Sequence, residues 1–276
     1  MSIRPGWLEQ LLDQEVIQRI NDDPRTVPGT FLGYPKGRIY ADIIEFGQAD
    51  FDAPAFGLSG DDRALLYTRY NQPRHLDELI HAWKCLFATA TLGGRPTVID
   101  LGCGPFTAGL ALGAVLGVDR DFRYYGVDRA RSMCTLGARL ADAARALGGL
   151  SARTAVNFSG GLAGIDFGPV RNDLTIVVAS YLLASPSVNV AQLVSEIVDT
   201  VGRVGPGPAA ILCTNSANEA MNRNYQAFRD GLIANGFEVK VEDVETFYET
   251  KTPKRLFYAV LYRKAETTIN LGAVVK

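Results

Sequence analysis

The sequence predicts an α/β protein whose central β-sheet is mostly parallel and carries one reversed strand near its end. Short apolar segments alternate with helical patterns from residue 95 onwards, which is typical of parallel strands joined by helical crossovers. A glycine-rich loop follows the first apolar segment, and two strand-like segments come last with no helix between them. Together these features predict a ligand crevice at the carboxyl ends of the parallel strands.

Composition excludes several classes of protein. The 276 residues are 47% hydrophobic and carry 28 basic and 30 acidic side chains, so the formal net charge is -2. Such a chain can bury a sizeable core, and its charge gives no bulk attraction to nucleic acid or to an anionic membrane. The four cysteines are scattered without C-x-x-C spacing, which disfavours a disulfide scaffold and a structural zinc site. We therefore expect reduced thiols and no metal.

Targeting and membrane signals are not found. The first fourteen residues contain no apolar core of signal-peptide length. The longest apolar stretch, Thr107–Val118, is too short to span a bilayer and predicts a buried helix instead. We expect a cytoplasmic protein that contacts no membrane.

Residues 1–94 are predicted to form a helical cap in front of a ligand-binding domain, residues 95–276. Apolar residues at helical spacing predict a helix over Trp7–Ile20. The segment from Asp23 to Gly60 is rich in Gly, Pro and Asp, which predicts an irregular loop or lid. Two helices are expected next, one over Asp61–Tyr70 and another beginning after the proline that follows it.

Seven segments of the second domain are predicted to be strands. The last two are separated by only about ten residues, whereas a parallel crossover needs roughly a dozen or more and usually a helix. These two strands should therefore pair antiparallel as a hairpin. The predicted strands are 97–101, 123–127, 154–158, 174–179, 209–214, 237–244 and 255–262.

The loop after the first strand is the chemical centre of the sequence. Asp100 stands at the strand end, and Gly102 and Gly104 let the backbone turn tightly and approach a ligand without an intervening Cβ. Pro105 suits the first position of the next helix, because its φ is fixed and it lacks an N–H group. The loop thus leads from strand to helix beside the crevice in which open α/β sheets bind ligands.

A second acidic residue follows the next strand. Asp128 lies 24 residues after Gly104, near the ~20-residue spacing at which a carboxylate binds a ribose diol. Met133 is placed to lie under the face of an adenine ring. A nicotinamide dinucleotide is disfavoured, because Thr107 stands where G-x-G-x-x-G requires glycine. Asp128 also argues against Arg129 as an NADP ligand, since its carboxylate would repel the 2′-phosphate.

Three parts of the chain carry a resemblance to a known family: Asp100–Gly104, Gly126–Asp128 with Met133, and Asp173–Ser180. They resemble the corresponding motifs of class I S-adenosylmethionine-dependent methyltransferases, and the resemblance covers about residues 95 to 264. It implies a Rossmann-like, seven-stranded sheet of order 3-2-1-4-5-7-6 with the last strand antiparallel and helices on both faces. It also implies a methyltransferase with S-adenosyl-L-methionine as its cofactor.

The resemblance implies roles for individual residues. Asp100 and Gly102 should contact the methionine part of the cofactor. Asp128 should bind the ribose hydroxyls, and Met133 should flank the adenine. The remaining implied contacts are Cys103, Gly104, Arg129, Ser159, Ser180 and Tyr181, with Tyr67 and Tyr70 of the cap closing over the cofactor.

The sequence departs from the family pattern at two places. Phe106 stands where the family has its third glycine, and a phenylalanine adds bulk beside the loop. The acidic residue expected to contact adenine after the third strand is not clear. Ser159 aligns with it by position, while Asp166 lies further along the same loop.

Few side chains are candidates for catalysis. The Tyr181 hydroxyl would orient a substrate after the fourth strand, although a packed aromatic ring is an equal alternative. His75 and His81 lie in the cap, and His81 falls on the polar face of its helix. Either histidine would reach the site from the cap, and the plainer alternative for both is a surface position. No motif identifies a general base.

The expected reaction is methyl transfer from S-adenosylmethionine to a nucleophilic atom of a small molecule. Residues Ala179–Leu182 stand where many methylases of nucleic-acid amino groups carry an Asn/Asp-Pro-Pro-aromatic motif. This departure and the near-zero charge argue against a nucleic-acid substrate. Two alternatives remain: an RNA- or ribosome-associated methyltransferase, and a non-catalytic module that binds S-adenosylmethionine.

Overall fold

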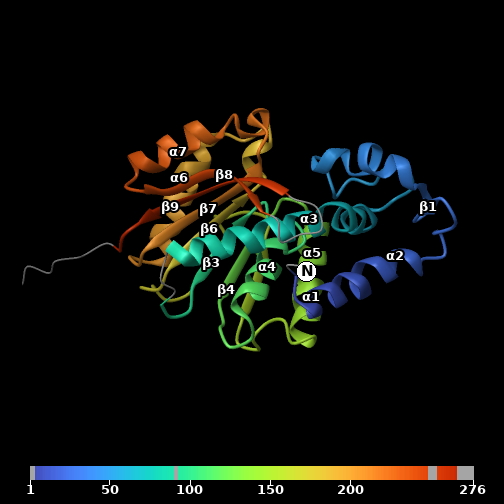
Figure 1. Cartoon of the computed structure of the whole chain (residues 1–276), viewed down its shortest axis with the longest axis horizontal. Coiled ribbons are helices and arrows are strands. Elements are labelled where there is room, and N and C mark those ends of the chain that lie inside the picture. The colour runs from blue at the N-terminus through green and yellow to red at the C-terminus, as the bar shows by residue number, and fades with distance from the viewer. Residues whose placement is uncertain (1–3, 90–92, 248–253, 266–276) are drawn as a thin grey trace, which may run out of the picture.

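The computed structural model describes residues 4–89, 93–247 and 254–265, and its centre is a seven-stranded sheet (Figure 1). The strands lie in the order β5-β4-β3-β6-β7-β9-β8. Numbered within this sheet alone, that is 3-2-1-4-5-7-6, so the predicted fold class and strand order are confirmed. The bounds are β3 Thr97–Leu101, β4 Arg123–Val127, β5 Ala155–Ser159, β6 Thr175–Ser180, β7 Ala209–Ser216, β8 Glu238–Phe247 and β9 Lys254–Arg263.

Strand direction follows the lengths of the connections. All neighbours from β5 to β7 are parallel, and β9 runs antiparallel to both β7 and β8. Asp100 in the middle of the sheet pairs with Gly126 on one side and Val178 on the other. The predicted terminal hairpin is therefore confirmed, and the carboxyl ends of β3, β4 and β6, at which open α/β sheets bind ligands, lie side by side.

Helices cover both faces of the sheet because its central strands are apolar on both faces. Val98 of β3 packs into one core with α3, α4 and α5, whereas the next residue, Ile99, packs into a second core with α6 and α7. The two helix layers are visible on opposite sides of the strands in Figure 1. The helix bounds are α3 Gly60–Thr89, α4 Thr107–Leu116, α5 Arg131–Ala146, α6 Val190–Val204 and α7 Tyr225–Ala234.

The helical start of the chain is present but irregular. The predicted helix over residues 7–20 is α1 (Gly6–Leu12), a π-helical turn η1 (Asp13–Gln18) and α2 (Arg19–Asn21) in succession. The predicted irregular segment follows and contains only short elements, which end before α3. These are β1 Thr30–Phe31, β2 Tyr34–Pro35, η2 Lys36–Arg38, η3 Ile39–Ile43 and η4 Glu45–Gly47.

One buried arginine organises this irregular segment. Arg63 is 2% exposed, and its guanidinium donates hydrogen bonds to the backbone carbonyls of Ile43, Asp50 and Ala53. It also pairs with Glu45 at 3.0 Å. Carbonyls of a chain without regular structure need such donors when they are removed from water, so Arg63 holds the loop in place.

The two helices predicted after residue 60 are in fact one, and this part of the sequence prediction was wrong. The helix α3 continues through Pro73, although a proline removes one intrahelical hydrogen bond. Tertiary contacts on either side of the proline outweigh that loss. Gln72 is fully buried and donates to the Pro105 carbonyl at 2.9 Å, and the Trp83 indole donates to the Ala108 carbonyl at 3.1 Å.

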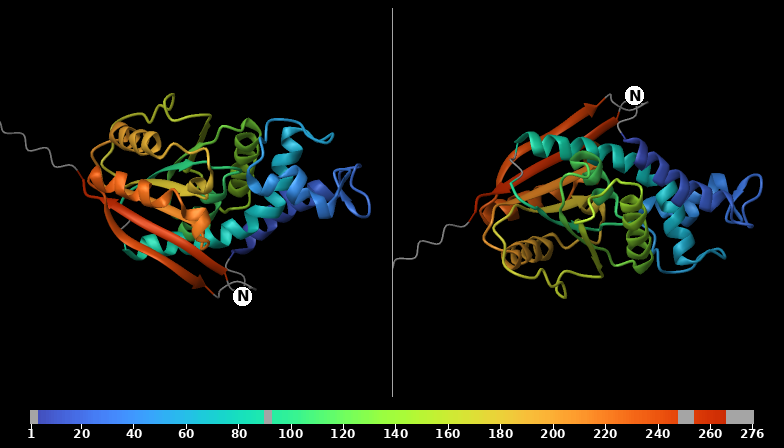
Figure 2. Two further views of the ribbon diagram at one scale, coloured as in Figure 1. Left: turned by 90° about the horizontal axis from the view of Figure 1, so that it is seen from above. Right: turned by 90° about the horizontal axis from the view of Figure 1, so that it is seen from below.

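The N-terminal segment is docked on the sheet domain rather than linked loosely to it. Leu8 and Ile39 belong to the same core as Val98 of β3. Asp52 accepts hydrogen bonds from the backbone amides of Arg131 and Ser132 and so caps α5. Figure 2 shows this segment at the α5 end of the molecule, with α3 running back beside the β8–β9 hairpin. A domain boundary near residue 94 stays a prediction.

No helix among the residues described is long and apolar enough to cross a membrane.

Candidate functional site

Three consecutive amides of the glycine loop are anchored to the end of β4. The amides of Gly102 and Cys103 both donate to the Val127 carbonyl, at 2.8 and 3.1 Å. The Gly104 amide donates to the Asp128 carboxylate at 2.9 Å. Gly102 and Gly104 have φ of 68° and 51°, the left-handed region that favours glycine. The loop conformation is therefore set by its own glycines and by the neighbouring strand.

Phe106 explains how the chain tolerates the loss of the third glycine. It retains the left-handed conformation, with φ of 67°, at a cost of roughly 1–2 kcal/mol for an L-residue with a side chain. Its ring is fully buried and packs edge-on against Tyr124 at 4.7 Å between centroids. Gly109, one turn along α4, leaves the space that the ring occupies, because a Cβ there would lie 1.9 Å from it. The added bulk thus points into the core and away from the loop.

Asp100 is a buried carboxyl group. It is 2% exposed and accepts a hydrogen bond of 2.5 Å from the Tyr124 hydroxyl. Burial, together with the negative charge of Asp128, raises the pKa of Asp100 to about 7, although the Tyr124 bond opposes that change. In this structure the Asp100 carboxyl is bound by Tyr124, and its predicted contact with the methionine part of the cofactor stays a prediction.

Asp128 directly follows β4 and is partly exposed. One carboxylate oxygen accepts from the Gly104 amide and the other from the Ala130 amide, both at 2.9 Å. Burial raises the pKa of Asp128, and these two amide bonds oppose that change. Each oxygen retains a further lone pair. The carboxylate is therefore rigidly oriented and able to accept hydroxyl donors from a ligand.

A pocket of about 210 Å³ lies beside the ends of β4 and β5. Ser159 and Asp166 both line it, so the structure brings together the two residues between which the sequence left the adenine contact undecided. Met133 does not line this pocket; it lies in the first turn of α5 and is 3% exposed. The other lining residues are Tyr125, Gly126, Asn157, Phe158, Gly164 and Ile165.

The end of β6 meets the middle of α3 through a compact polar cluster. The Tyr181 hydroxyl donates to a Glu78 carboxylate oxygen at 2.9 Å, and the other oxygen of Glu78 accepts from Arg74 at 2.8 Å. The His75 ring stacks on the Tyr181 ring with 4.3 Å between centroids. Ser180, next to Tyr181, accepts a hydrogen bond from the Thr214 hydroxyl.

Tyr181 has an unusual backbone conformation and a hydroxyl group whose pKa is raised. Its φ of 59° is left-handed, a conformation that costs energy in a residue with a bulky side chain. Burial and the Glu78 carboxylate raise the pKa of Tyr181 well above its usual range. The hydroxyl therefore stays protonated near neutral pH and acts as a hydrogen-bond donor.

Comparison with known proteins finds no matching family model and no matching curated protein sequence. Solved structures do match. Magnesium protoporphyrin IX methyltransferase from Synechocystis PCC 6803 with bound SAM shares 17% identity over 83% of this chain and 95% of that chain, with a TM-score of 0.46. A proposed O-methyltransferase from Nostoc punctiforme PCC 73102 shares 13% identity over 80% of this chain and 72% of that chain, with a TM-score of 0.50.

The chain has the class I S-adenosylmethionine-dependent methyltransferase fold. At this level of identity the likeness concerns the fold, and it agrees with the strand order and the reversed final strand. The family resemblance read from the glycine loop and the terminal hairpin is confirmed at the level of the fold.

The remaining residues that the resemblance implied as cofactor contacts do not all lie at the loop. Tyr67 lies over the loop, since a Cβ on Gly104 would be 4.0 Å from its ring, whereas the Tyr70 hydroxyl donates to the Lys36 carbonyl in the cap. Cys103 is buried, and burial raises the pKa of its thiol, which favours packing over a nucleophilic role. Arg129 is exposed.

The structure does not place His81 at the surface, which was the plainer of the two alternatives for this residue. The residue is 8% exposed and lies between α3 and the terminal hairpin, where its ring stands edge-on to Tyr258. The sequence also missed Glu78 and Arg74, the two charged partners at Tyr181. Their spacing of four residues on one helix was visible, but nothing in the sequence connected them with a residue 103 positions away from Glu78.

Proposed function

We propose that the protein is an S-adenosylmethionine-dependent methyltransferase that acts on a small molecule, with its cofactor in the crevice between the glycine loop, Asp128 and Tyr181. The observation that carries this proposal is the Asp128 carboxylate, which fixes the Gly104 amide and is partly exposed beside the loop. Such an acceptor at the end of the second parallel strand suits the two hydroxyls of a ribose.

The loop is compatible with a ligand on condition that two side chains move. A Cβ on Gly104 would lie 4.0 Å from the Tyr67 ring, and one on Gly102 would lie 3.4 Å from Leu182. These side chains cover the glycines in the present structure. We expect both to swing aside when the methionine part of the cofactor enters and then to shield it from water.

The pocket next to Ser159 is our proposed adenine site. It lies beside the end of β4, after which Asp128 stands, and the Asp128 amide donates to the Ser159 carbonyl. Asp166 contributes a carboxylate that accepts hydrogen bonds, as the exocyclic amine of adenine requires. Tyr125 and Phe158 supply apolar surface to the same pocket.

S-adenosylmethionine, when bound, supplies a methyl group already activated by a positively charged sulfonium. The chain then has to orient the acceptor and exclude water. In our proposal the Tyr181 hydroxyl, fixed by Glu78, positions the acceptor. The imidazole of His75, stacked on Tyr181, takes up the acceptor proton when the nucleophile is a hydroxyl or an ammonium group.

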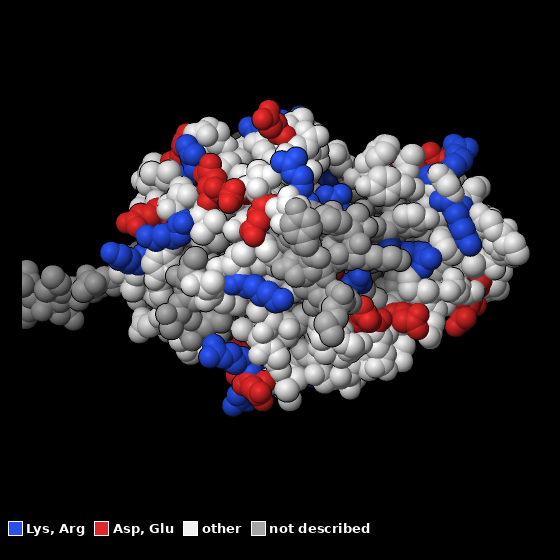
Figure 3. Space-filling view, in the orientation of Figure 1, with Lys and Arg blue, Asp and Glu red and all other residues white. Residues whose placement is uncertain are grey.

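Surface charge supports a small acceptor over a nucleic acid. On the face shown in Figure 3, basic and acidic side chains are interspersed and form no extended basic stripe. Proteins that bind nucleic acid neutralise many phosphates and present clustered Lys and Arg for that purpose.

Calorimetry with S-adenosylmethionine, S-adenosylhomocysteine and NAD tests the proposal. We expect the two S-adenosyl ligands to bind and NAD to give no heat. Replacing Asp128 by Asn should weaken the binding of S-adenosylhomocysteine by about 1.5–3 kcal/mol, or roughly 10- to 150-fold, because hydrogen bonds to a charged group are lost. The control is Asp142→Asn, an exposed carboxylate on α5, which should bind normally.

Binding of NAD alone, or unchanged affinity in Asp128→Asn, would contradict the proposed site. Methyl transfer should then be measured with tritiated S-adenosylmethionine against small acceptors and against RNA. Transfer to RNA with steep salt dependence would favour an RNA methyltransferase. Ligand binding without transfer to either class would favour a non-catalytic module.

A further inference from the structure

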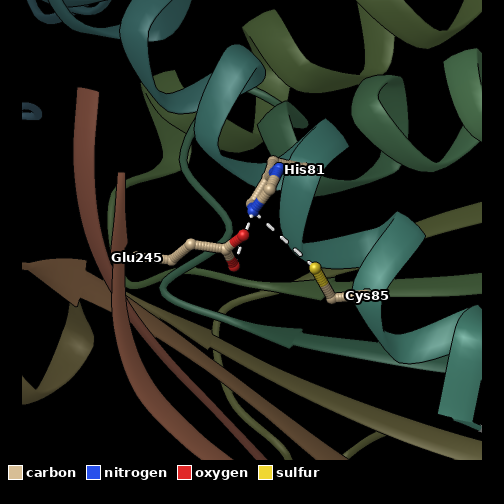
Figure 4. Close-up of side chains that lie close together, drawn as sticks. All are labelled: His81, Cys85 and Glu245. Carbon is tan, nitrogen blue, oxygen red and sulfur yellow. Dashed lines mark hydrogen bonds and ion pairs between the residues drawn. The ribbon is translucent and has the colours of Figure 1, made fainter. Parts of the chain in front are cut away.

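A second cluster of reactive side chains lies outside the crevice, between α3 and the terminal hairpin. His81 and Cys85 are four residues apart on α3, so they lie on the same face of the helix. Glu245 reaches them from β8, which is 164 residues away from His81 in the chain. Figure 4 shows the imidazole, the thiol and the carboxylate turned toward one another.

The three side chains converge on one point. His81 Nε2 lies 3.1 Å from a Glu245 carboxylate oxygen and 3.7 Å from the Cys85 sulfur, and all three atoms lie within 4.8 Å of one another. Zinc binds nitrogen, oxygen and sulfur at about 2.0–2.3 Å in a tetrahedron, which places its ligand atoms roughly 3.3–3.6 Å apart. The two distances at Nε2 therefore match those across a bound zinc ion to within a few tenths of an ångström.

One ring nitrogen of His81, Nε2, faces both the Cys85 sulfur and the Glu245 carboxylate (Figure 4). One nitrogen carries either one proton or one lone pair, so it cannot donate fully to both partners. A cation accepts one lone pair from each of the three groups at once.

We propose that His81, Cys85 and Glu245 form a binding site for a divalent transition-metal ion of the zinc type. The combination of thiolate, imidazole and carboxylate favours zinc, cobalt or nickel, whereas magnesium and calcium prefer oxygen ligands alone. Three protein ligands leave the fourth position of the ion for water or another ligand.

The proposed ligands differ in how far they are buried, which gives the site a fixed inner side and an accessible outer side. The His81 side chain is 10% exposed, whereas that of Glu245 is 40% exposed. The Tyr258 ring lies edge-on to the imidazole with 6.2 Å between ring centroids, and the Tyr258 side chain also interacts with Cys85 and Glu245. Because Glu245 is the more exposed ligand, an ion would enter from its side.

The site would add a metal-mediated link between α3 and the terminal hairpin, which already interact through the His81–Glu245 pair and through Cys85 and Tyr258. It ties α3 to the terminal hairpin within one helical turn of Glu78, which holds Tyr181. Metal binding would thus stabilise the position of α3 over the sheet. This inference is independent of the proposed methyl transfer, because none of the three residues takes part in it.

Cobalt titration of the tag-free, full-length chain after dialysis against a chelator tests the site. We expect one Co²⁺ per chain, visible bands of tetrahedral intensity, a thiolate-to-cobalt charge-transfer band in the near ultraviolet, and loss of both signals when Zn²⁺ is added. The variant Cys85→Ser should lose the charge-transfer band. The matched control is Cys134→Ser, another half-buried cysteine, which should retain it.

Absence of saturable binding, or a charge-transfer band that persists in Cys85→Ser, would overturn the proposal. Glu245→Gln provides a test at a more exposed position that does not depend on how well the cysteine variant folds. It should lower zinc affinity at least about tenfold in competition with a chromophoric chelator, since even outer-shell partners of a metal contribute that much. Zinc should also raise the melting temperature of the wild type more than that of this variant at the same zinc concentration. Equal affinity and equal stabilisation in both proteins would overturn the site.

Discussion

The glycine loop and the cluster around Tyr181 lie at neighbouring strand ends of one sheet, yet they are held in different ways. The loop is fixed by backbone amides, three of which bind the end of β4. The cluster is fixed by side chains, because Tyr181 depends on Glu78 and Arg74 from α3. The difference teaches that the proposed cofactor side of this fold is built from one loop and the neighbouring strand end, whereas the proposed acceptor side is assembled from side chains of distant parts of the chain.

This contrast explains what the sequence could predict. The loop, the acidic residue after β4 and the hairpin are contiguous patterns, so fold class and strand order followed from them. The long helix α3 could not be predicted from such a pattern, because its continuation through Pro73 depends on the buried contacts of Gln72 and Trp83. The cluster of His81, Cys85 and Glu245 lacks motif spacing, and only the pairing of β8 with β9 and the packing of α3 bring it together.

The largest expected effect concerns the buried carboxyl of the loop. The pKa of Asp100 is raised to about 7 in the folded protein, against about 4 when unfolded. Between these pH values the folded protein holds the Asp100 proton more strongly than the unfolded chain does. The free energy of unfolding of the wild type, relative to that of Asp100→Asn, should therefore fall as pH rises from about 4 to 7. The slope approaches about 1.4 kcal/mol per pH unit. Urea unfolding of both proteins at several pH values measures it, and parallel curves would contradict the buried state of Asp100.

The next effect concerns Phe106 and the glycine that accommodates it. A Cβ at Gly109 would meet the Phe106 ring at 1.9 Å, so Gly109→Ala should destabilise the protein by about 1–3 kcal/mol through overpacking. The double variant Phe106→Gly with Gly109→Ala removes the ring and should lose less stability than the sum of the two single variants. Chemical denaturation of all four proteins gives the coupling. Additive losses would show that the two positions are independent.

A smaller effect is expected at the acceptor side. Tyr181→Phe removes a hydrogen bond to the buried Glu78 and should cost about 1 kcal/mol of stability. It should change the affinity for S-adenosylhomocysteine less than threefold, because the loop is held by its own amides. Tyr34→Phe, which loses a hydroxyl bond to Asp42 in the cap, is the matched control. A large loss of cofactor affinity in Tyr181→Phe alone would mean that the two sides are not separable.

The smallest effect concerns the contact that joins the cap to the sheet domain. Asp52 accepts from the first amides of α5, and the Ser132 amide bond is the main cause that lowers the pKa of Asp52. Asp52→Ala should cost about 0.5–1 kcal/mol, as for an exposed helix cap. This contribution is present above the unfolded pKa near 4 and is lost as pH falls through the lower folded pKa.

Chemical denaturation of the wild type and of Asp52→Ala at pH 7 and at low pH distinguishes the helix cap made by Asp52 from an ordinary surface charge. Asp142→Ala, on the exposed side of α5, loses only a surface pair with Arg145 and should change stability less. If Asp52→Ala cost no more stability than Asp142→Ala at pH 7, the N-terminal segment would be held on the sheet domain by its apolar contacts alone. A loss confined to Asp52→Ala would show that one carboxylate from the N-terminal segment orders the helix that follows Asp128, and with it one edge of the proposed cofactor site.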